Sequence, residues 1–175
     1  MLNYRIATQS DALNIAQLHT KSWQENYRGA FLDKFLDGEL IENRKTVWED
    51  RLKNPAQNQH VILAETENEL CGFACIFIDD DPDFGTLLDN LHVASASKGQ
   101  GVGTQLIKLV AQVTQQKSNS PKFYLWALEQ NISARKFYES LGGIHQDTLL
   151  EEHPGGSFAN ACRYVWEDVG VLLGE

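Results

Sequence analysis

The sequence predicts an α+β (mixed α/β) fold: a central mixed, mostly antiparallel sheet of about seven strands flanked by about four helices. Three strand-like segments between residues 60 and 93, separated by turn-forming residues, predict an antiparallel meander. A glycine-rich turn, an amphipathic helix and another strand follow, which predicts a crossover between parallel strands. A chain of 175 residues suits one hydrophobic core, so we expect a single domain over residues 1–175.

Composition limits the classes of partner. The chain has 24 acidic and 15 basic residues, a formal charge of -9, which disfavours a general binder of nucleic acid. Its longest apolar stretch, residues 71–78, is far shorter than the roughly 20 residues of a membrane span. The first residues lack the features of a secretory signal. We therefore expect a cytoplasmic protein with no membrane or nucleic-acid partner.

The three cysteines point the same way, because an odd number cannot form a closed disulfide framework. Cys71 and Cys75 fall in one predicted strand, which separates them by about 13 Å. We expect buried, structural thiols.

The first half of the chain alternates strand and helix signals. A short strand is predicted at residues 4–7, followed by a capping box from Thr8 to Asp11 and a helix. A second helix is predicted at residues 41–52 and ends near Pro55. The apolar face of the first helix comprises Ala12, Ile15, Ala16, His19 and Trp23. The meander strands are predicted at residues 60–65, 70–78 and 86–93.

The second half contains the crossover. Its helix carries Val102, Leu106, Leu109, Val110 and Val113 on one face and leads to a strand at residues 122–126. Asn131 can cap a further helix, with Ala134, Phe137, Tyr138 and Leu141 on one face and Gly142 and Gly143 at its end. Closing strands are predicted at residues 144–150 and 161–166, with a loop between them.

The glycine turn at residues 98–104 lies between a strand and a helix. Its backbone N–H groups and the helix dipole should attract an anion there. The G-x-G-x-G spacing excludes the dinucleotide fingerprint and the Walker A loop. Residues 98–138 carry a local charge of +5, which favours a phosphorylated ligand. A flexible turn, with lysines scattered over solvated faces, is the alternative reading.

Two segments resemble a known family. The strand at residues 88–93 followed by Lys98-Gly-Gln-Gly-Val-Gly resembles the acetyl-CoA motif of the GNAT superfamily of N-acetyltransferases, with Lys98 where the family has Arg or Gln. About 28 residues after that turn, Asn131, Ala134 and the Phe137-Tyr138 pair match the second family signature, and Leu141-Gly142 follows. The resemblance covers nearly the whole chain.

This resemblance implies an acetyltransferase in which a primary amine attacks acetyl-CoA directly in a ternary complex, without a metal. It also implies a V-shaped opening between the strands at 86–93 and 122–126, where pantetheine bonds to main-chain groups near Leu91 and Val93. The residues it implies for acetyl-CoA are Leu91, His92, Val93, Lys98, Gly99, Gln100, Gly101, Val102, Gly103, Thr104, Asn131, Ala134 and Tyr138.

Tyr138 corresponds to the usual general acid of the family. Because the pKa of tyrosine is about 10 and that of a thiol about 8.5, full proton transfer to the leaving sulfur is uphill by roughly 2 kcal/mol. Donation of a hydrogen bond by Tyr138 is therefore sufficient for this role. Simple packing of Tyr138 on the sheet remains the alternative.

For the proton acceptor, strand alternation predicts that Asp89 faces the cleft together with Leu91 and Val93. The same alternation turns His92 to the other face, as an exposed or core-satisfied histidine. The rival bases or substrate contacts are Glu25, in the first helix, and Glu151, Glu152 and His153, in the loop between the closing strands.

Residues 22–29 resemble the first-helix segment that borders the acceptor in one GNAT subgroup, so Trp23, Glu25 and Tyr27 are predicted to bind substrate. Core packing is the alternative for Trp23 and Tyr27. The acceptor is a small-molecule or peptide amine, and a homodimer is left open. A non-catalytic acyl-CoA-binding module or sensor with the same fold is the alternative function.

Overall fold

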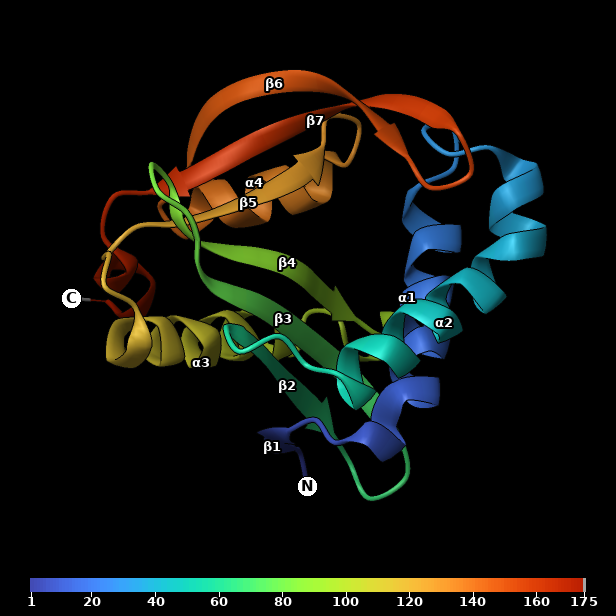
Figure 1. Cartoon of the computed structure of the whole chain (residues 1–175), viewed down its shortest axis with the longest axis horizontal. Helices are drawn as coiled ribbons and strands as arrows, with labels where there is room; N and C mark the ends of the chain where they lie inside the picture. The colour runs from blue at the N-terminus through green and yellow to red at the C-terminus, as the bar shows by residue number, and fades with distance from the viewer. Residues whose placement is uncertain (175) are drawn as a thin grey trace.

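A computed structural model describes residues 1–174. Within this range the strands form one mixed sheet in the order β1-β2-β3-β4-β5-β7-β6 (Figure 1). The strands are β1 (Asn3–Ile6), β2 (Gln59–Glu65), β3 (Leu70–Asp81), β4 (Gly85–Val93), β5 (Phe123–Leu128), β6 (Ile144–His153) and β7 (Ser157–Trp166). The α-helices are α1 (Ala12–Asn26), α2 (Leu40–Lys53), α3 (Val102–Lys117) and α4 (Ile132–Ser140). The predicted fold class is confirmed.

The start of α1 is capped as predicted, with a short 3₁₀ turn at Gln9–Asp11 before it. The Asp11 carboxylate accepts hydrogen bonds from the backbone N–H of Thr8 at 2.7 Å and from the Thr8 hydroxyl at 2.9 Å. Arg5 adds two hydrogen bonds at 2.8 Å, which hold the pKa of Asp11 down at about 2. These contacts join the start of α1 to the edge strand β1.

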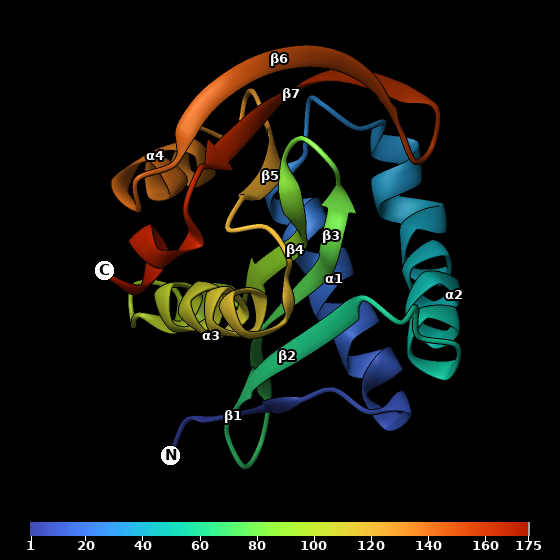
Figure 2. The same ribbon diagram turned by 60° about the vertical axis from the view of Figure 1, so that its left-hand side comes forward.

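The helices lie on both faces of the sheet. Figure 2 shows α1 and α2 on one face and α3 on the other. The α3 face buries a core that includes Leu106 and Val110, and the α1–α2 face buries one that includes Ile15 and Trp48. No helix among residues 1–174 is both long enough and apolar enough to cross a membrane. All three cysteines are free and buried, as predicted.

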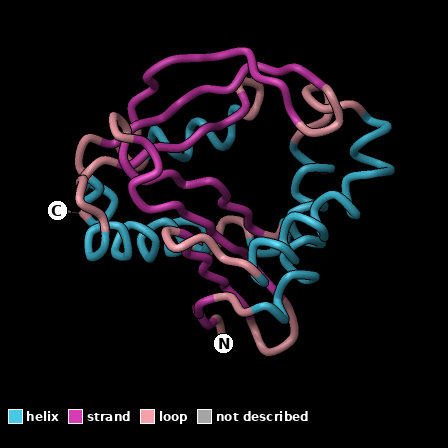
Figure 3. The backbone as a smooth tube through the Cα atoms, viewed as in Figure 1, coloured by secondary structure: helices cyan, strands magenta, loops and turns pink. Residues whose placement is uncertain are grey.

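The sheet opens between β4 and β5. These parallel strands pair only from Thr86 to Leu88, opposite Phe123 to Leu125. Beyond this point β4 continues against β3, and β5 continues against β7, so the two strands diverge (Figure 3). The expected V-shaped opening is therefore present, and one edge of β4 faces it without a partner strand.

The β6–β7 hairpin is longer than predicted. Glu151, Glu152 and His153 belong to β6, and the turn spans only residues 154–156. The prediction of a loop was wrong. Their charged side chains give no strand pattern in the sequence, whereas backbone pairing with β7 fixes them in a strand. The hairpin arches toward the segment between α1 and α2 (Figure 1). His153 stacks on Phe31 there, with ring centroids 4.9 Å apart.

Candidate active site

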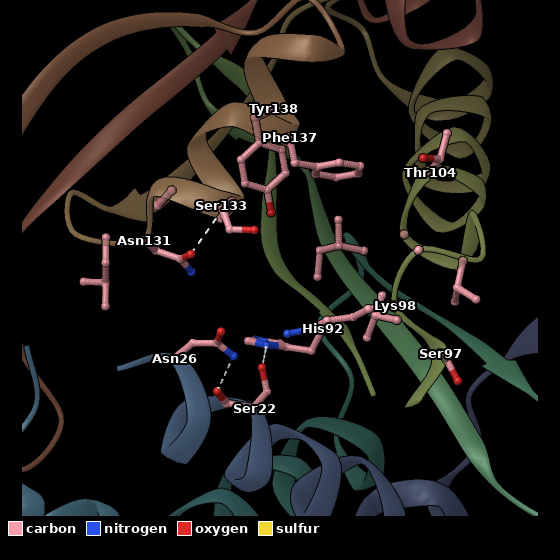
Figure 4. A pocket seen from close by; sticks show the side chains of 18 of the residues that line it. Ser22, Asn26, His92, Ser97, Lys98, Thr104, Asn131, Ser133, Phe137 and Tyr138 are labelled. Atoms are coloured by element: carbon pink, nitrogen blue, oxygen red, sulfur yellow. Dashed lines mark hydrogen bonds between the residues drawn. The ribbon is translucent and has the colours of Figure 1, made fainter. Parts of the chain in front are cut away.

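A cavity of about 570 Å³ fills the V-shaped opening. Its wall is formed by α1, the end of β4, the glycine turn and start of α3, the end of β5, and α4 (Figure 4). The lining residues are Ser22, Asn26, Tyr27, Leu91, His92, Val93, Ser97, Lys98, Gly99, Gly101, Val102, Gly103, Thr104, Trp126, Ala127, Leu128, Asn131, Ser133, Ala134, Phe137 and Tyr138. The cavity thus brings the two motifs of the sequence together.

The glycine turn presents unused backbone donors to this cavity. Gly99 and Gly101 have φ of 76° and 80°, the left-handed region that glycine adopts without strain. The first backbone bond of α3 runs from the N–H of Gln105 to the carbonyl of Gly101 at 2.9 Å. Within the described chain, the N–H groups of residues 99–104 donate no backbone hydrogen bond. Five of these six residues, all except Gln100, line the cavity, so their N–H groups can hold an anionic group such as a diphosphate there.

The α4 side supplies an amide and a phenol. The Asn131 side chain accepts a hydrogen bond from the N–H of Ala134 at 3.2 Å and caps α4, as predicted. Tyr138 is 8% exposed, and its hydroxyl points into the cavity (Figure 4). Burial raises the pKa of Tyr138 above its usual value, and the nearby Tyr27 phenol raises it further. Burial also raises the pKa of Tyr27 to about 12. Both phenols are therefore protonated donors at neutral pH.

His92 lies at the opposite wall, where its Nδ1 is 2.7 Å from the Oγ of Ser22. It packs against His19 with ring centroids 4.5 Å apart, and the indole N–H of Trp48 donates to His19. Burial, then the charges of Arg44 and Lys98, lower the pKa of His92 to about 3. The His92 ring is buried and has a hydrogen-bond partner in the core, which is one of the two alternatives predicted for it. However, it also lines the cavity, so the prediction that it points away from the cleft was wrong.

Asp89 does not face the cavity, which contradicts its predicted orientation. Asn90 pairs with Cys75 and Leu88 pairs with Ile76, so Asp89 is the extra residue of a β-bulge. The bulge breaks the alternation on which the prediction depended. The Asp89 carboxylate instead accepts a hydrogen bond from Arg51 of α2 at 2.7 Å. This ion pair holds the Asp89 carboxylate outside the cavity lining.

The other predicted acidic groups also lie outside the lining. Glu25 is exposed, and its carboxylate accepts a hydrogen bond from the Ser95 hydroxyl at 2.5 Å. Glu151 and Glu152 lie on the hairpin. His153, at the end of the same strand, packs on Phe31 rather than lining the cavity.

The remaining predicted contacts divide in the same way. Tyr27 lines the cavity, whereas Trp23 lies outside the lining. The ring centroids of Trp23 and Tyr27 are 5.3 Å apart, and the guanidinium of Arg44 lies over the Trp23 ring. Gln100 also lies outside the lining, and its side-chain amide donates to the carbonyl of Ala96. Every other residue predicted for acetyl-CoA lines the cavity.

Sequence reasoning missed several wall residues, chiefly Ser22 and Asn26 on α1. Their i, i+4 spacing was a usable signal, because it places them on one helix face. Trp126, Ser133 and Phe137 also belong to the wall. Trp126 lies at the end of β5 where the sheet opens, and that opening is not encoded in its local sequence.

Comparisons with known proteins agree with this geometry. The model of the acetyltransferase (GNAT) family matches residues 15–143, and the chain belongs to this family. Among curated protein sequences, none matches significantly.

The solved structures share the fold at low sequence identity. PaiA N-acetyltransferase from Thermoplasma acidophilum, in complex with coenzyme A, is 16% identical, with a TM-score of 0.71 over 95% of this chain and 99% of its own. YncA from Salmonella typhimurium, a putative acetyltransferase solved with acetyl-CoA, is 16% identical, with a TM-score of 0.67 over 95% and 93%. A variant of spermidine N-acetyltransferase SpeG from Vibrio cholerae is 18% identical, with a TM-score of 0.67 over 98% and 96%.

Proposed function

We propose that this protein is an acetyl-CoA-dependent N-acetyltransferase that acts on a primary amine by direct attack in a ternary complex. The observation that carries the proposal is the row of free amides at residues 99–104, which opens on the same cavity as the Tyr138 hydroxyl. The family match and the neighbours solved with coenzyme A and acetyl-CoA support this assignment.

Acetyl-CoA supplies the activated acetyl group when it is bound. The amides of residues 99–104 hold its diphosphate, and the Lys98 ammonium adds a positive charge beside them. The unpaired edge of β4 near Leu91 and Val93 offers main-chain groups to the pantetheine amides, in the manner of an added strand. A main-chain N–H of the same edge stabilises the negative charge that develops on the carbonyl oxygen.

Tyr138 assists the departure of sulfur by donating a hydrogen bond. Its raised pKa keeps the phenol protonated, so it is present in the donor form over the whole neutral range. Complete proton transfer to a thiolate would be uphill by more than about 2 kcal/mol, since the thiol pKa is about 8.5. Stabilisation of the thiolate by a hydrogen bond is therefore the role that fits Tyr138.

The three reduced cysteines further suit a cytoplasmic location, where thiols are kept reduced.

The experiment is a transfer assay on purified protein with acetyl-CoA and a broad panel of primary amines. Release of free coenzyme A thiol and the mass of the acetylated product are both measured. Amine-dependent thiol release with a product heavier by one acetyl group supports the proposal. Binding of acetyl-CoA without acetylation of any amine would instead identify a non-catalytic acyl-CoA sensor.

A further inference from the structure

The cavity wall carries very little charge. Among residues 1–174, Lys98 is the one lining residue with a formal charge at neutral pH, and His92 is neutral. The rest of the wall is aromatic, apolar or neutral and polar. The carboxylates nearest to it in sequence lie outside the lining and have other partners: Glu25 accepts from Ser95, and Asp89 pairs with Arg51. Glu129 accepts from the Asn160 amide, and Glu139 accepts from the Tyr164 hydroxyl.

A second cation, Arg44, is buried close to this wall but does not line the cavity. Arg44 of α2 is 8% exposed, lies 4.5 Å over the ring of Trp23, and donates hydrogen bonds to the amide oxygen of Asn43. It forms no ion pair with a carboxylate in the described part of the chain. Its charge and that of Lys98 both lower the pKa of His92, so both fields reach the cavity wall. The lining therefore carries a positive formal charge and no negative one.

An ammonium group would be poorly accommodated in such a cavity. It would lose hydration without gaining a counter-charge, which is costly in a buried site. The aromatic ring of Tyr27 offers a cation–π contact, which compensates only part of that loss. The ring of Trp126 already has the guanidinium of Arg163 at 4.7 Å from its centroid. The phosphates of bound acetyl-CoA would lie beside the glycine turn and Lys98, and no carboxylate lines the part of the wall near Tyr27 and Asn26.

An uncharged amine meets suitable partners on α1. The Asn26 side-chain amide donates to the carbonyl of Ser22 at 2.7 Å, which leaves its oxygen directed into the cavity (Figure 4). A neutral amine N–H can donate to that oxygen without any charge being buried.

Resting on the proposed function, we propose that the acceptor is a weakly basic primary amine, an α-amino group or an arylamine, which enters this carboxylate-free cavity uncharged. The pKa of an α-amino group is about 8, so roughly one molecule in ten is neutral at pH 7. The pKa of an alkylamine such as the lysine side chain is about 10.4, so roughly one in 10³ is neutral. Oligocationic amines such as spermidine are accordingly poor acceptors.

Two pairs of isomers test this proposal. Nε-acetyl-lysine amide has a free α-amine, and Nα-acetyl-lysine amide has a free side-chain amine. In the second pair, 4-methylaniline is the weak base and benzylamine the strong one. At pH 7 we expect the weakly basic isomer to have the higher kcat/KM, by about 10²-fold in the lysine pair. That ratio should shrink as the pH rises toward 10.

A strongly basic isomer that is equal or better at pH 7 in either pair overturns this inference and leaves the acetyltransferase function standing. Absence of acetylation for every amine in a broad panel overturns the proposed function itself. The two failures are therefore distinguishable.

Asn26→Asp tests the same idea within the wall, because it introduces a carboxylate of nearly the same shape. We expect it to shift the kcat/KM ratio toward the strongly basic isomers by at least about tenfold at pH 7. The matched control is Glu25→Gln, which removes a neighbouring carboxylate outside the cavity and should leave the ratio unchanged. A folded Asn26→Asp protein with an unchanged ratio contradicts the inference. If this variant does not fold, the isomer ratios of the unmodified protein decide the question.

Discussion

The hydroxyl of Ser22 and the Nδ1 of His92 lie 2.7 Å apart, and this contact joins α1 to β4 at the wall of the cavity. His92 and the adjacent His19 are both buried, and both have a pKa below the usual histidine value. Their neutral forms are therefore part of the folded state. Protonation of either ring would place a charge beside Arg44 in a desolvated region.

The protein should accordingly lose stability as the pH falls from 7 to 5. The folded pKa of His92 is about 3, below the unfolded value near 6.5, so its contribution is complete above 6.5 and is lost toward 3. We expect a loss of about 2 kcal/mol between pH 7 and 5 from His92. Chemical denaturation at each pH measures this loss.

Substitution His92→Gln should make that pH dependence shallower, with the contribution of His19 remaining, whereas His145→Gln, at an exposed position, should not. Asp11 does not contribute to the stability change between pH 7 and 5, because its pKa of about 2 places its effect on stability below pH 4. Equal slopes for the unmodified protein and His92→Gln would contradict this account of His92.

Tyr138→Phe should lower kcat by about 10²-fold, because the developing thiolate loses its hydrogen-bond donor. Affinity for coenzyme A should stay within about twofold, since the phenyl ring still fills the wall. Steady-state kinetics and calorimetry measure the two quantities. Tyr124→Phe is the matched control, because its hydroxyl binds Asp80 outside the cavity. Equal losses of kcat in both variants would remove Tyr138 from the chemistry.

Gly103→Ala should separate stability from ligand binding. Gly103 lies in α3, and an added Cβ would meet Phe137 and Val93 at an ordinary 3.6 Å. Alanine in a helix is more stable than glycine by about 0.5–1 kcal/mol, so the melting temperature should not fall. The same methyl group occupies the wall beside the free amides, and we expect coenzyme A affinity to fall at least about tenfold.

The control for this variant is Gly38→Ala, where an added Cβ meets no atom within 4 Å and the position lies outside the cavity. It should leave coenzyme A affinity unchanged. Unaltered affinity in Gly103→Ala as well would show that the ligand does not approach the start of α3 closely.

Asp89→Asn should cost stability rather than activity. It removes the partly buried ion pair with Arg51, which we expect to lower the free energy of unfolding by about 1 kcal/mol. Turnover should stay within about threefold, because the carboxylate faces α2 and not the cavity. A loss of kcat as large as that of Tyr138→Phe would restore Asp89 as a group in the reaction.

Much of the fold was predictable because its signals are local. The apolar periodicity of α1 and α3 and the turns between β2, β3 and β4 each lie within one short window. The bulge at Asp89 and the full length of β6 depend on pairing with other strands, which alternation within one strand does not reveal.

The site divides in the same way. The glycine turn and Asn131 belong to contiguous motifs, and the structure places both at the cavity, as predicted. Ser22 and Asn26 reach the wall only because α1 packs beside β4, and the Ser22–His92 contact spans 70 residues of sequence. The absence of Asp89 from the wall is likewise a tertiary property, because the β-bulge breaks the strand alternation and the carboxylate pairs with Arg51 of α2.

The central claim is that the free amides of residues 99–104 bind the diphosphate of coenzyme A. Titration of ¹⁵N-labelled protein with coenzyme A, followed by amide NMR, tests it most directly. The account predicts that the largest shifts occur at residues 99–104, with smaller ones along the β4 edge. Saturation with coenzyme A that leaves these amide resonances unmoved would contradict it.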